Sequence, residues 1–428
     1  MRPDHRYNGM DNIRDNIRDN MRDHMRDNIR DCMRNKSFTY EIAGHFIEIV
    51  WKLPDGQHWQ LPGFAPFLSK KMTGTENDPQ TQNSSENKLL TVNVISIEEA
   101  QEDEDADHAA QDRIFKNPER TVSPKQIVSP ERTVSPEQIV SPERKISSFE
   151  IENGTCELCK QDNSYKFQIF TIDGKLSVKL EMGKGRSAMN CLCALYENSA
   201  RQMRVPDPHH LRFAMWMAVG FAGIPEWTAA IHASVIIYEN QAVLFLGESG
   251  TGKSTHTRLW LDNIPGTRLL NDDSPIIRLH KCKNNHNGNE NSNDNENSND
   301  NSNDNSNGKQ ENPLYIYGSP WSGKGNIYRN ECYQVAAIVR LQQAPYNRST
   351  RLNVVQGFAA LYPSFPPAYL KDEDLHEEIC TIISGILKTI PVFRLECLPK
   401  PSAAILMHQK IFIDEVNLPG NANLSNFL

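Results

Sequence analysis

The sequence has few hydrophobic residues and no excess of positive charge. Hydrophobic residues make up 38% of its 428 residues, which is low for a chain that packs along its whole length. Lysine and arginine number 46 against 54 aspartates and glutamates, and no basic stretch alternates with aromatic residues. With a formal net charge of −8, nucleic acid is not expected as a partner.

Long apolar runs are also missing. The first residues, MRPDHRYNGM, lack the apolar core of a secretory signal, and no uninterrupted apolar run is long enough to cross a bilayer. The nine cysteines are an odd number, which argues against a complete disulfide framework. We therefore expect a cytoplasmic protein with reduced thiols and no membrane partner.

Low-complexity tracts account for the shortage of hydrophobic residues. Residues 1–35 hold a four-residue repeat that stacks like charges at i, i+4 spacing, which predicts a disordered tail, with a frayed helix as the alternative. A proline-bearing repeat within residues 98–147 predicts an extended linker rather than a β-helix. The Asn-rich residues 283–312 are too polar to form a core and predict a loop insert. Disorder is also expected near residues 73–88 and in the tail 419–428.

Residues 36–204 are predicted to form a β-rich amino-terminal domain. Short stretches of alternating polar and apolar residues, separated by turn residues, occur at 36–53, 89–97, 147–154, 165–174 and 175–183. None of them has the spacing of a catalytic motif. We expect a scaffold or a partner-binding module.

Two cysteine pairs raise the question of a zinc site. Cys156 and Cys159 form a C-x-x-C, and Cys191 and Cys193 form a C-x-C, so four thiolates could in principle meet at one metal. The second pair has the wrong spacing for a zinc knuckle, and isolated cysteines are common core residues. We favour the core interpretation.

Residues 205–418 are predicted to form an α/β domain. HHLRFAMWMAVGFAG predicts a core helix, and IHASVIIYENQAVLFLGESGTGKSTHTRLWLDNI predicts strand, turn, strand, glycine loop and helix in that order. TRLLNDDSPIIRL and PLYIYGSPW flank the Asn-rich insert, which we expect at the tip of a hairpin. A strand at QVAAIVRL and a helix at LHEEICTIISGILKTI complete the domain.

The stretch GESGTGKST matches the phosphate-loop pattern G-x-x-x-x-G-K-[ST] between a strand and a helix. Its glycines let backbone N–H groups point at phosphate oxygens, Lys253 supplies positive charge, and the Ser254 hydroxyl is placed to bind Mg²⁺. The helix dipole adds to this attraction from Thr255 onward. We predict that ATP and Mg²⁺ are bound by Gly247, Glu248, Ser249, Gly250, Thr251, Gly252, Lys253, Ser254 and Thr255.

A second stretch, GSPWSGKG from Gly318, also fits G-x-x-x-x-G-K. Gly325 stands where the magnesium-binding hydroxyl should be, and Pro320 removes a backbone donor. We therefore do not expect a second nucleotide loop here. Trp321 and Lys324 either face a substrate or belong to an exposed turn with a packed tryptophan.

The stretch TRLLNDDSP places Asp272 and Asp273 at the end of a strand that follows the loop helix. A kinase needs one acid for the metal and a base for the acceptor hydroxyl, and two adjacent carboxylates could divide these roles. The alternative is a solvated turn capped by Asn and Asp.

The segment IHASVIIYENQAVLFLGESGTGKS followed by LLNDDSP resembles the catalytic domain of HPr kinase/phosphorylase. The fold of that family is related to ATP-dependent phosphoenolpyruvate carboxykinase. The resemblance covers about residues 228–280 well and extends more weakly to about residue 345. It implies a carboxykinase/HPr-kinase-like P-loop domain of the α/β class, preceded here by the β-rich domain and interrupted by disordered low-complexity inserts.

The resemblance also implies roles for individual residues. Lys253 and Ser254 would bind phosphate and Mg²⁺, and Asp272 would be the acid/base. Asp273 would be a second acid near the metal. His232 lies on the strand before the loop strand, as a histidine does in the family, and would neighbour a phosphate or a carboxylate.

The chain departs from the family pattern downstream, where the Glu-Arg-Gly stretch that supplies another metal carboxylate is absent. The resemblance implies an ATP-dependent kinase that transfers the γ-phosphate to a serine hydroxyl of a protein or peptide. The alternatives are a metabolic enzyme like phosphoenolpyruvate carboxykinase and a nucleotide-binding regulatory protein without turnover. Assembly into a homo-oligomer is left open.

Overall fold

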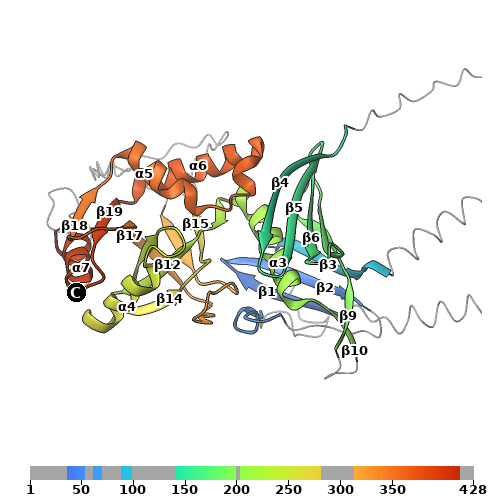
Figure 1. Cartoon of the computed structure of the whole chain (residues 1–428), viewed down its shortest axis with the longest axis horizontal. Helices are drawn as coiled ribbons and strands as arrows, with labels where there is room; N and C mark the ends of the chain where they lie inside the picture. The colour runs from blue at the N-terminus through green and yellow to red at the C-terminus, as the bar shows by residue number, and fades with distance from the viewer. Residues whose placement is uncertain are drawn as a thin grey trace, which may run out of the picture. The chain divides into compact units, whose positions relative to one another are not determined.

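The computed structural model describes residues 36–53, 61–69, 88–98, 141–198, 203–280 and 313–414. The fold is mixed α/β, with large β-sheets and few helices (Figure 1). The chain divides into two units, residues 1–222 and 223–428. The repeat tail, residues 73–87, most of the acidic and proline-bearing tracts, the whole Asn-rich insert and the carboxyl tail lie outside the described residues.

The first unit is built on an eight-stranded sheet with the order β1-β2-β3-β8-β7-β6-β5-β4. Neighbouring strands are antiparallel except that β3 runs parallel to both β2 and β8. Its elements are β1 (Lys36–Ile42), β2 (His45–Lys52), the 3-10 turn η2 (Ala65–Phe67), β3 (Lys88–Ser96), β4 (Arg144–Ile151), β5 (Gly154–Gln161), β6 (Ser164–Thr171), β7 (Leu176–Met182), β8 (Ala188–Cys193), the small hairpin β9 (Leu195–Asn198) with β10 (Met203–Pro206), and α3 (Pro208–Gly223). All the strands expected from alternation are present, and β5, β8, β9 and β10 are additional.

Helix α3 packs on this first sheet, although the sequence analysis assigned it to the following domain. The ring of Phe213 lies 6.3 Å from that of Phe149 and 5.9 Å from that of Phe167. His210 Nδ1 hydrogen-bonds Ser177 Oγ at 2.8 Å. The helix is apolar around most of its circumference, which suits a buried position but does not specify which sheet it covers.

The four cysteines of the two pairs are all buried in the first sheet. Cys156 and Cys159 lie on β5 and Cys191 and Cys193 on β8, and strands β6 and β7 separate β5 from β8. Burial raises the pKa of Cys156 to about 12. The four thiols do not converge on one point, which supports their interpretation as core residues.

The second unit is built on a nine-stranded sheet with the order β11-β15-β16-β17-β13-β12-β14, in which β19 also pairs with β17, and β18 with β19. Its strands are β11 (Thr228–Ala230), β12 (Ala233–Tyr238), β13 (Gln241–Leu246), β14 (Arg268–Asn271), β15 (Ile276–Leu279), β16 (Leu314–Tyr317), β17 (Cys332–Gln343), β18 (Arg348–Arg351) and β19 (Val392–Cys397). Its helices are α4 (Lys253–Asn263), α5 (Val354–Leu361), α6 (Glu373–Thr389) and α7 (Pro401–His408), with the short turns η5 (Ile224–Glu226), η6 (Tyr362–Ser364) and η7 (Tyr369–Lys371) and the π-helical η8 (Gln409–Asp414).

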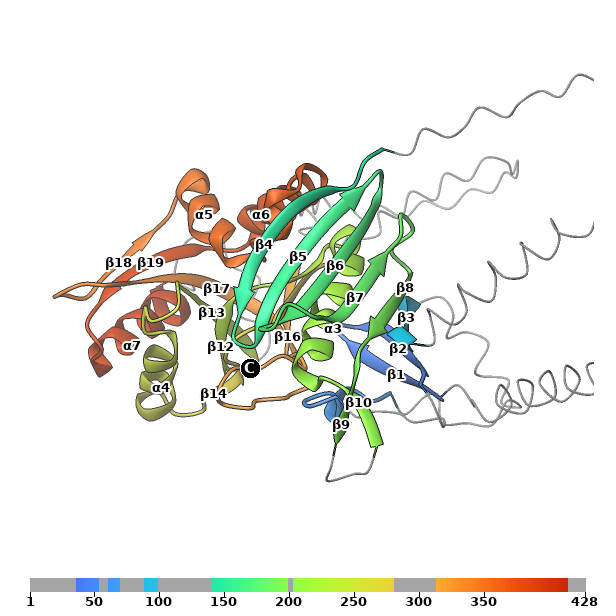
Figure 2. The ribbon, with the colours of Figure 1, turned by 45° about the vertical axis from the view of Figure 1, so that its right-hand side comes forward.

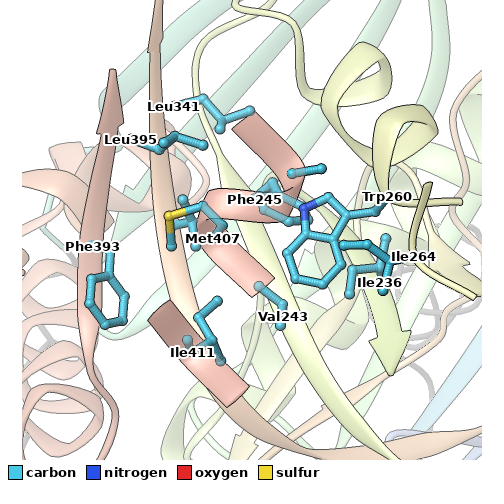
Figure 3. Close-up of a cluster of buried hydrophobic side chains, with 13 residues drawn as sticks. Ile236, Val243, Phe245, Trp260, Ile264, Leu341, Phe393, Leu395, Met407 and Ile411 are labelled. Atoms are coloured by element: carbon cyan, nitrogen blue, oxygen red, sulfur yellow. The ribbon is translucent and has the colours of Figure 1, made fainter. Parts of the chain in front are cut away.

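Helices cover both faces of the second sheet. Figures 1 and 2 show α4 and α7 on one side and α5 and α6 on the other. Between the sheet and α4 lies a buried cluster in which the rings of Phe245 and Trp260 are 5.9 Å apart (Figure 3). Alternate residues of β17 enter this cluster: Ala337, Val339 and Leu341. None of the helices in the described ranges has both the length and the apolar character of a membrane span.

The hairpin predicted around the Asn-rich insert is confirmed. β15 and β16 pair antiparallel, with Leu279 opposite Leu314 at the end next to the insert. His280 N donates to Pro313 O at 3.1 Å, so the chain leaves and re-enters the sheet at adjacent points. The two ends need only a short connection.

Replacing residues 281–312 by a short glycine-containing turn is therefore expected to leave the thermal unfolding midpoint of the protein nearly unchanged. The matched control is Leu314→Ala in the full-length chain. Leu314 is fully buried, so its truncation is expected to cost about 2–5 kcal/mol of unfolding free energy. Calorimetry that shows a larger loss for the replacement than for the control would contradict this account of the hairpin.

Candidate functional site

Strand pairing gathers the predicted site residues at one edge of the second sheet. β12 is antiparallel to β13, with Ala233 opposite Leu246, and antiparallel to β14, with Val235 opposite Asn271. The end of β13, the end of β14 and the start of β12 therefore meet. In open α/β sheets, ligands bind outside the carboxyl ends of the strands.

The stretch GESGTGKST forms a tight loop between β13 and α4. Gly250 and Gly252 have φ angles of 82° and 101°, a backbone conformation that side-chain-bearing residues rarely adopt. Thr251 donates to the carbonyl of Glu248 from its backbone N–H at 3.2 Å and from its hydroxyl at 2.6 Å. The loop thus curls back on itself before α4 begins at Lys253, as the sequence pattern predicts.

Lys253 lies inside this loop and is only 8% exposed. Its Nζ donates to the carbonyl oxygens of Gly247 at 2.7 Å and Glu248 at 3.2 Å. Burial lowers the pKa of Lys253, and the charge of Arg340 lowers it further against the opposing effect of Asp273. The neighbouring Ser254, in the first turn of α4, is exposed.

The Asp pair sits on a turn that a buried asparagine holds in place. Asn271 Oδ1 accepts from the backbone N–H groups of Asp273 at 2.9 Å and Ser274 at 3.0 Å. Ala233 N donates to Asp273 O at 3.1 Å, which ties the turn to the start of β12. The turn is capped by Asn271, and the two carboxylates point to different partners.

The carboxylate of Asp272 is enclosed by the loop that carries GSPWSGKG. Oδ1 accepts from Ser322 Oγ at 2.5 Å and from Gly323 N at 2.8 Å, and Oδ2 accepts from Gly325 N at 2.9 Å. A Cβ atom on Gly325 would lie 2.7 Å from Oδ2, so a side chain does not fit there without a shift. The second glycine-rich stretch therefore does direct backbone N–H groups at an anion, but that anion is the protein's own carboxylate.

Of the two interpretations of Trp321, contact with a substrate or packing in a turn, its burial supports packing. Trp321 is 6% exposed, and its carbonyl accepts from Asn271 Nδ2 at 3.1 Å and from Ser319 Oγ at 2.9 Å. Lys324, between the two glycines that contact Asp272, is exposed. The loop is anchored by its glycines, its serines and its tryptophan.

Asp273 and His232 lie near Lys253 at the loop of residues 247–252. His232 Nε2 lies 3.8 Å from Asp273 Oδ1, and the two side chains are 44% and 50% exposed. Burial lowers the pKa of His232, and the positive charges of Lys253 and Arg340 lower it further, while Asp273 acts in the opposite direction. The imidazole is therefore mainly neutral at pH 7.

Arg340 is a site residue that the sequence analysis did not single out. It lies on β17, paired in parallel register with Leu246, the last residue before the loop. Its side chain is 20% exposed, and its Nη2 lies 3.6 Å from Glu248 Oε1. The available signal was one arginine inside the otherwise apolar strand QVAAIVRL, but its use required knowing that β17 is the neighbour of β13.

A cavity of about 630 Å³ adjoins the loop on the side of α4. The glycines Gly250 and Gly252 form part of its wall, and the remainder is largely apolar, including Leu259, Leu341, Pro345, Leu398 and Pro399. Ligand sites in proteins commonly enclose about 300–1,000 Å³. The cavity is therefore large enough for a nucleoside.

The structure thus brings Lys253, Asp273 and His232 together around the loop and adds Arg340. It directs the carboxylate of Asp272, the predicted acid/base, into the loop of residues 318–326. Of the residues predicted to hold phosphates, 247–252 form the loop and Lys253, Ser254 and Thr255 begin α4.

Gly325→Ala is expected to lower the unfolding free energy by about 1–3 kcal/mol, because its Cβ would displace the carboxylate of Asp272 from the loop. The neighbouring Lys324→Ala, at an exposed position, is expected to stay within about 0.5 kcal/mol of the wild type. Thermal or urea unfolding of both variants measures this. Equal stability of the two variants would contradict the anchoring role of Asp272.

No protein-family profile matches the chain, and no curated protein is similar to it. Among solved structures, it is similar to the HPr(Ser) kinase/phosphatase from Coxiella burnetii, with 12% sequence identity. The match covers 42% of this chain and 86% of that one, with a TM-score of 0.21. A similarity of this strength does not assign the chain to a family.

Proposed function

We propose that the second unit is an ATP-dependent kinase that transfers the γ-phosphate of ATP to a hydroxyl of a protein or peptide, with serine as the expected acceptor. The observation that carries this proposal is the position of Asp273. Its carboxylate lies beside a phosphate loop that holds Lys253, and no described residue other than His232 pairs with it.

The loop residues would bind the phosphates. In the structure Lys253 donates to two loop carbonyls, and an incoming phosphate would offer its ammonium group a stronger, charged acceptor. The backbone N–H groups of the loop and the start of α4 would add partial positive charge. The apolar cavity beside Gly250 and Gly252 would take the nucleoside.

Magnesium fits the donors present. Mg²⁺ prefers oxygen ligands and keeps several waters, so it needs few groups from the protein. The exposed hydroxyl of Ser254 and the half-exposed carboxylate of Asp273 would be those groups. When bound, the metal would neutralise phosphate charge during transfer.

Asp273 would also be the group nearest to the acceptor hydroxyl. As the oxygen–phosphorus bond to the acceptor forms and the bond between the γ-phosphorus and the bridging oxygen of ADP breaks, the hydroxyl proton would pass to the Asp273 carboxylate. Asp272 is less suited to this role because its two oxygens already accept three hydrogen bonds from the loop. We therefore propose Asp273 as the base instead of Asp272. Asp272 would position the loop of residues 318–326.

A second candidate is a nucleotide-binding regulatory protein without turnover. The commitment of Asp272 to the loop favours it, because one carboxylate then remains to serve both the metal and the acceptor. This candidate predicts ATP binding without transfer.

The test incubates the full-length protein with γ-labelled ATP, Mg²⁺ and a lysate of its host. A labelled protein or peptide is expected with the wild type and not with Lys253→Ala or Asp273→Asn. Lys253→Ala should weaken Mg·ATP binding by about tenfold to a hundredfold, since it removes a charged donor to the phosphates. Asp273→Asn should retain most of the binding if Asp273 acts as the base.

Asp272→Asn separates the two assignments of the base. As a positioning residue, Asp272 should leave measurable transfer when it is changed to Asn, with a lowered thermal midpoint. Complete loss of transfer at wild-type stability would restore Asp272 as the base. ATP binding with no labelled product would favour the regulatory protein, and absence of ATP binding would refute both candidates.

Proton uptake on nucleotide binding provides an independent check through His232. In the free protein its pKa lies below the ordinary value of 6.5, so the imidazole is mostly neutral at pH 6.5 and above. Bound phosphates would add negative charge and raise this pKa, so the protein should take up protons on binding near pH 6 and not near pH 8.

Calorimetric titration with Mg·ATP in two buffers of different ionisation enthalpy measures this uptake. His232→Asn, which cannot titrate, is expected to remove it. Identical uptake in the wild type and the variant at pH 6 would show that His232 does not lie near the phosphates.

A further inference from the structure

The side chain of Arg340 is more covered than is usual for an arginine. Val339 and Leu341, on either side of it in β17, point into the buried cluster against α4, so Arg340 points to the opposite face of the sheet. There the end of β17 lies beside the end of β13, in register with Leu246. Four-fifths of the side chain is covered, since its exposed fraction is 20%.

The partner of this guanidinium is a weak one. Glu248 belongs to the phosphate loop, its side chain is 81% exposed, and the closest N–O distance in the pair is 3.6 Å. An ion pair with one largely exposed partner is screened by solvent and weak. A mostly covered cation held by an exposed, loosely placed carboxylate can exchange that carboxylate for a better anion at little cost.

Arg340 is also near enough to both halves of the site for its charge to act on each. In addition to the effect of burial, its positive charge lowers the pKa of Lys253, inside the loop. It also lowers the pKa of His232, next to Asp273. A phosphate located between the loop lysine and the carboxylate of Asp273 is the terminal one, because it is the phosphate that faces the acceptor. The free site thus holds two cations around the place where that phosphate would lie.

We propose that Arg340 binds the γ-phosphate of ATP, exchanging its ion pair with Glu248 for that phosphate, so that the site distinguishes a nucleoside triphosphate from a diphosphate. This inference rests on the proposed function and adds a residue and a selectivity to it. Arginine suits the role because its planar group donates two parallel hydrogen bonds to a phosphate.

The experiment compares the affinities of the full-length protein for Mg·ADP and for the magnesium complex of a non-hydrolysable ATP analogue with an imido bridge, by calorimetric titration. Arg340→Met is expected to weaken analogue binding by about tenfold to a hundredfold and to change ADP binding by less than about threefold. Retained ADP binding shows at the same time that the variant is folded.

Two further variants sharpen the result. Glu248→Gln removes the competing carboxylate, so it should tighten analogue binding by about twofold to tenfold, and this gain should vanish in the double variant with Arg340→Met. Arg394→Met is the matched control: Arg394 is the register partner of Arg340 on β19, one strand further from the loop. It is expected to change neither affinity.

Equal weakening of analogue and ADP binding by Arg340→Met, or no weakening of either, would overturn the assignment of Arg340 while leaving the kinase proposal in place. A wild-type protein that binds neither nucleotide would overturn the proposed function itself, and with it this inference. A selective loss of analogue affinity in Arg340→Met, absent in Arg394→Met, is the result the structure predicts.

Discussion

The site depends on how four strands of the second sheet pair with one another. β12 lies antiparallel between β13 and β14, and β17 runs parallel to β13 on its other side. This arrangement alone places the loop after β13, the Asp pair after β14, the histidine before β12 and the arginine of β17 at one edge. Those residues are far apart in the sequence, and a change of strand order would separate them.

Two glycine-rich stretches in this unit enclose charges of opposite sign. Each curls around a charged group of the chain itself. In residues 318–326 the charge is the Asp272 carboxylate, and the result is a fixed loop next to the Asp pair. In residues 247–252 the charge is the ammonium group of Lys253, which donates to two carbonyls of the loop. Lys253 and Arg340 lie beside this loop, whereas Lys324 on the other loop is exposed.

Much of this arrangement could be predicted from local sequence, and the reasons for the rest are physical. The glycine loop between β13 and α4 and the hairpin of β15 and β16 follow from short-range patterns: glycine spacing, a preceding apolar strand and two strands joined by a polar insert. The hydrogen bonds of Asp272 could not be predicted, because its partners Gly323 and Gly325 reach it only through tertiary packing. Helix α3 was assigned to the other unit for a similar reason, since an apolar helix does not specify the sheet that it covers. Arg340 was missed because only the parallel pairing of β17 with β13 brings it to the loop.

The most direct test of the central claim is a calorimetric titration of the full-length protein with Mg·ATP, alongside Lys253→Ala. The claim is that residues 247–255 bind the phosphates of a nucleoside triphosphate. It predicts saturable binding of one ATP per chain, with the affinity reduced by about tenfold or more in the variant. Absence of binding to the wild type, or equal affinity in the two proteins, would contradict it.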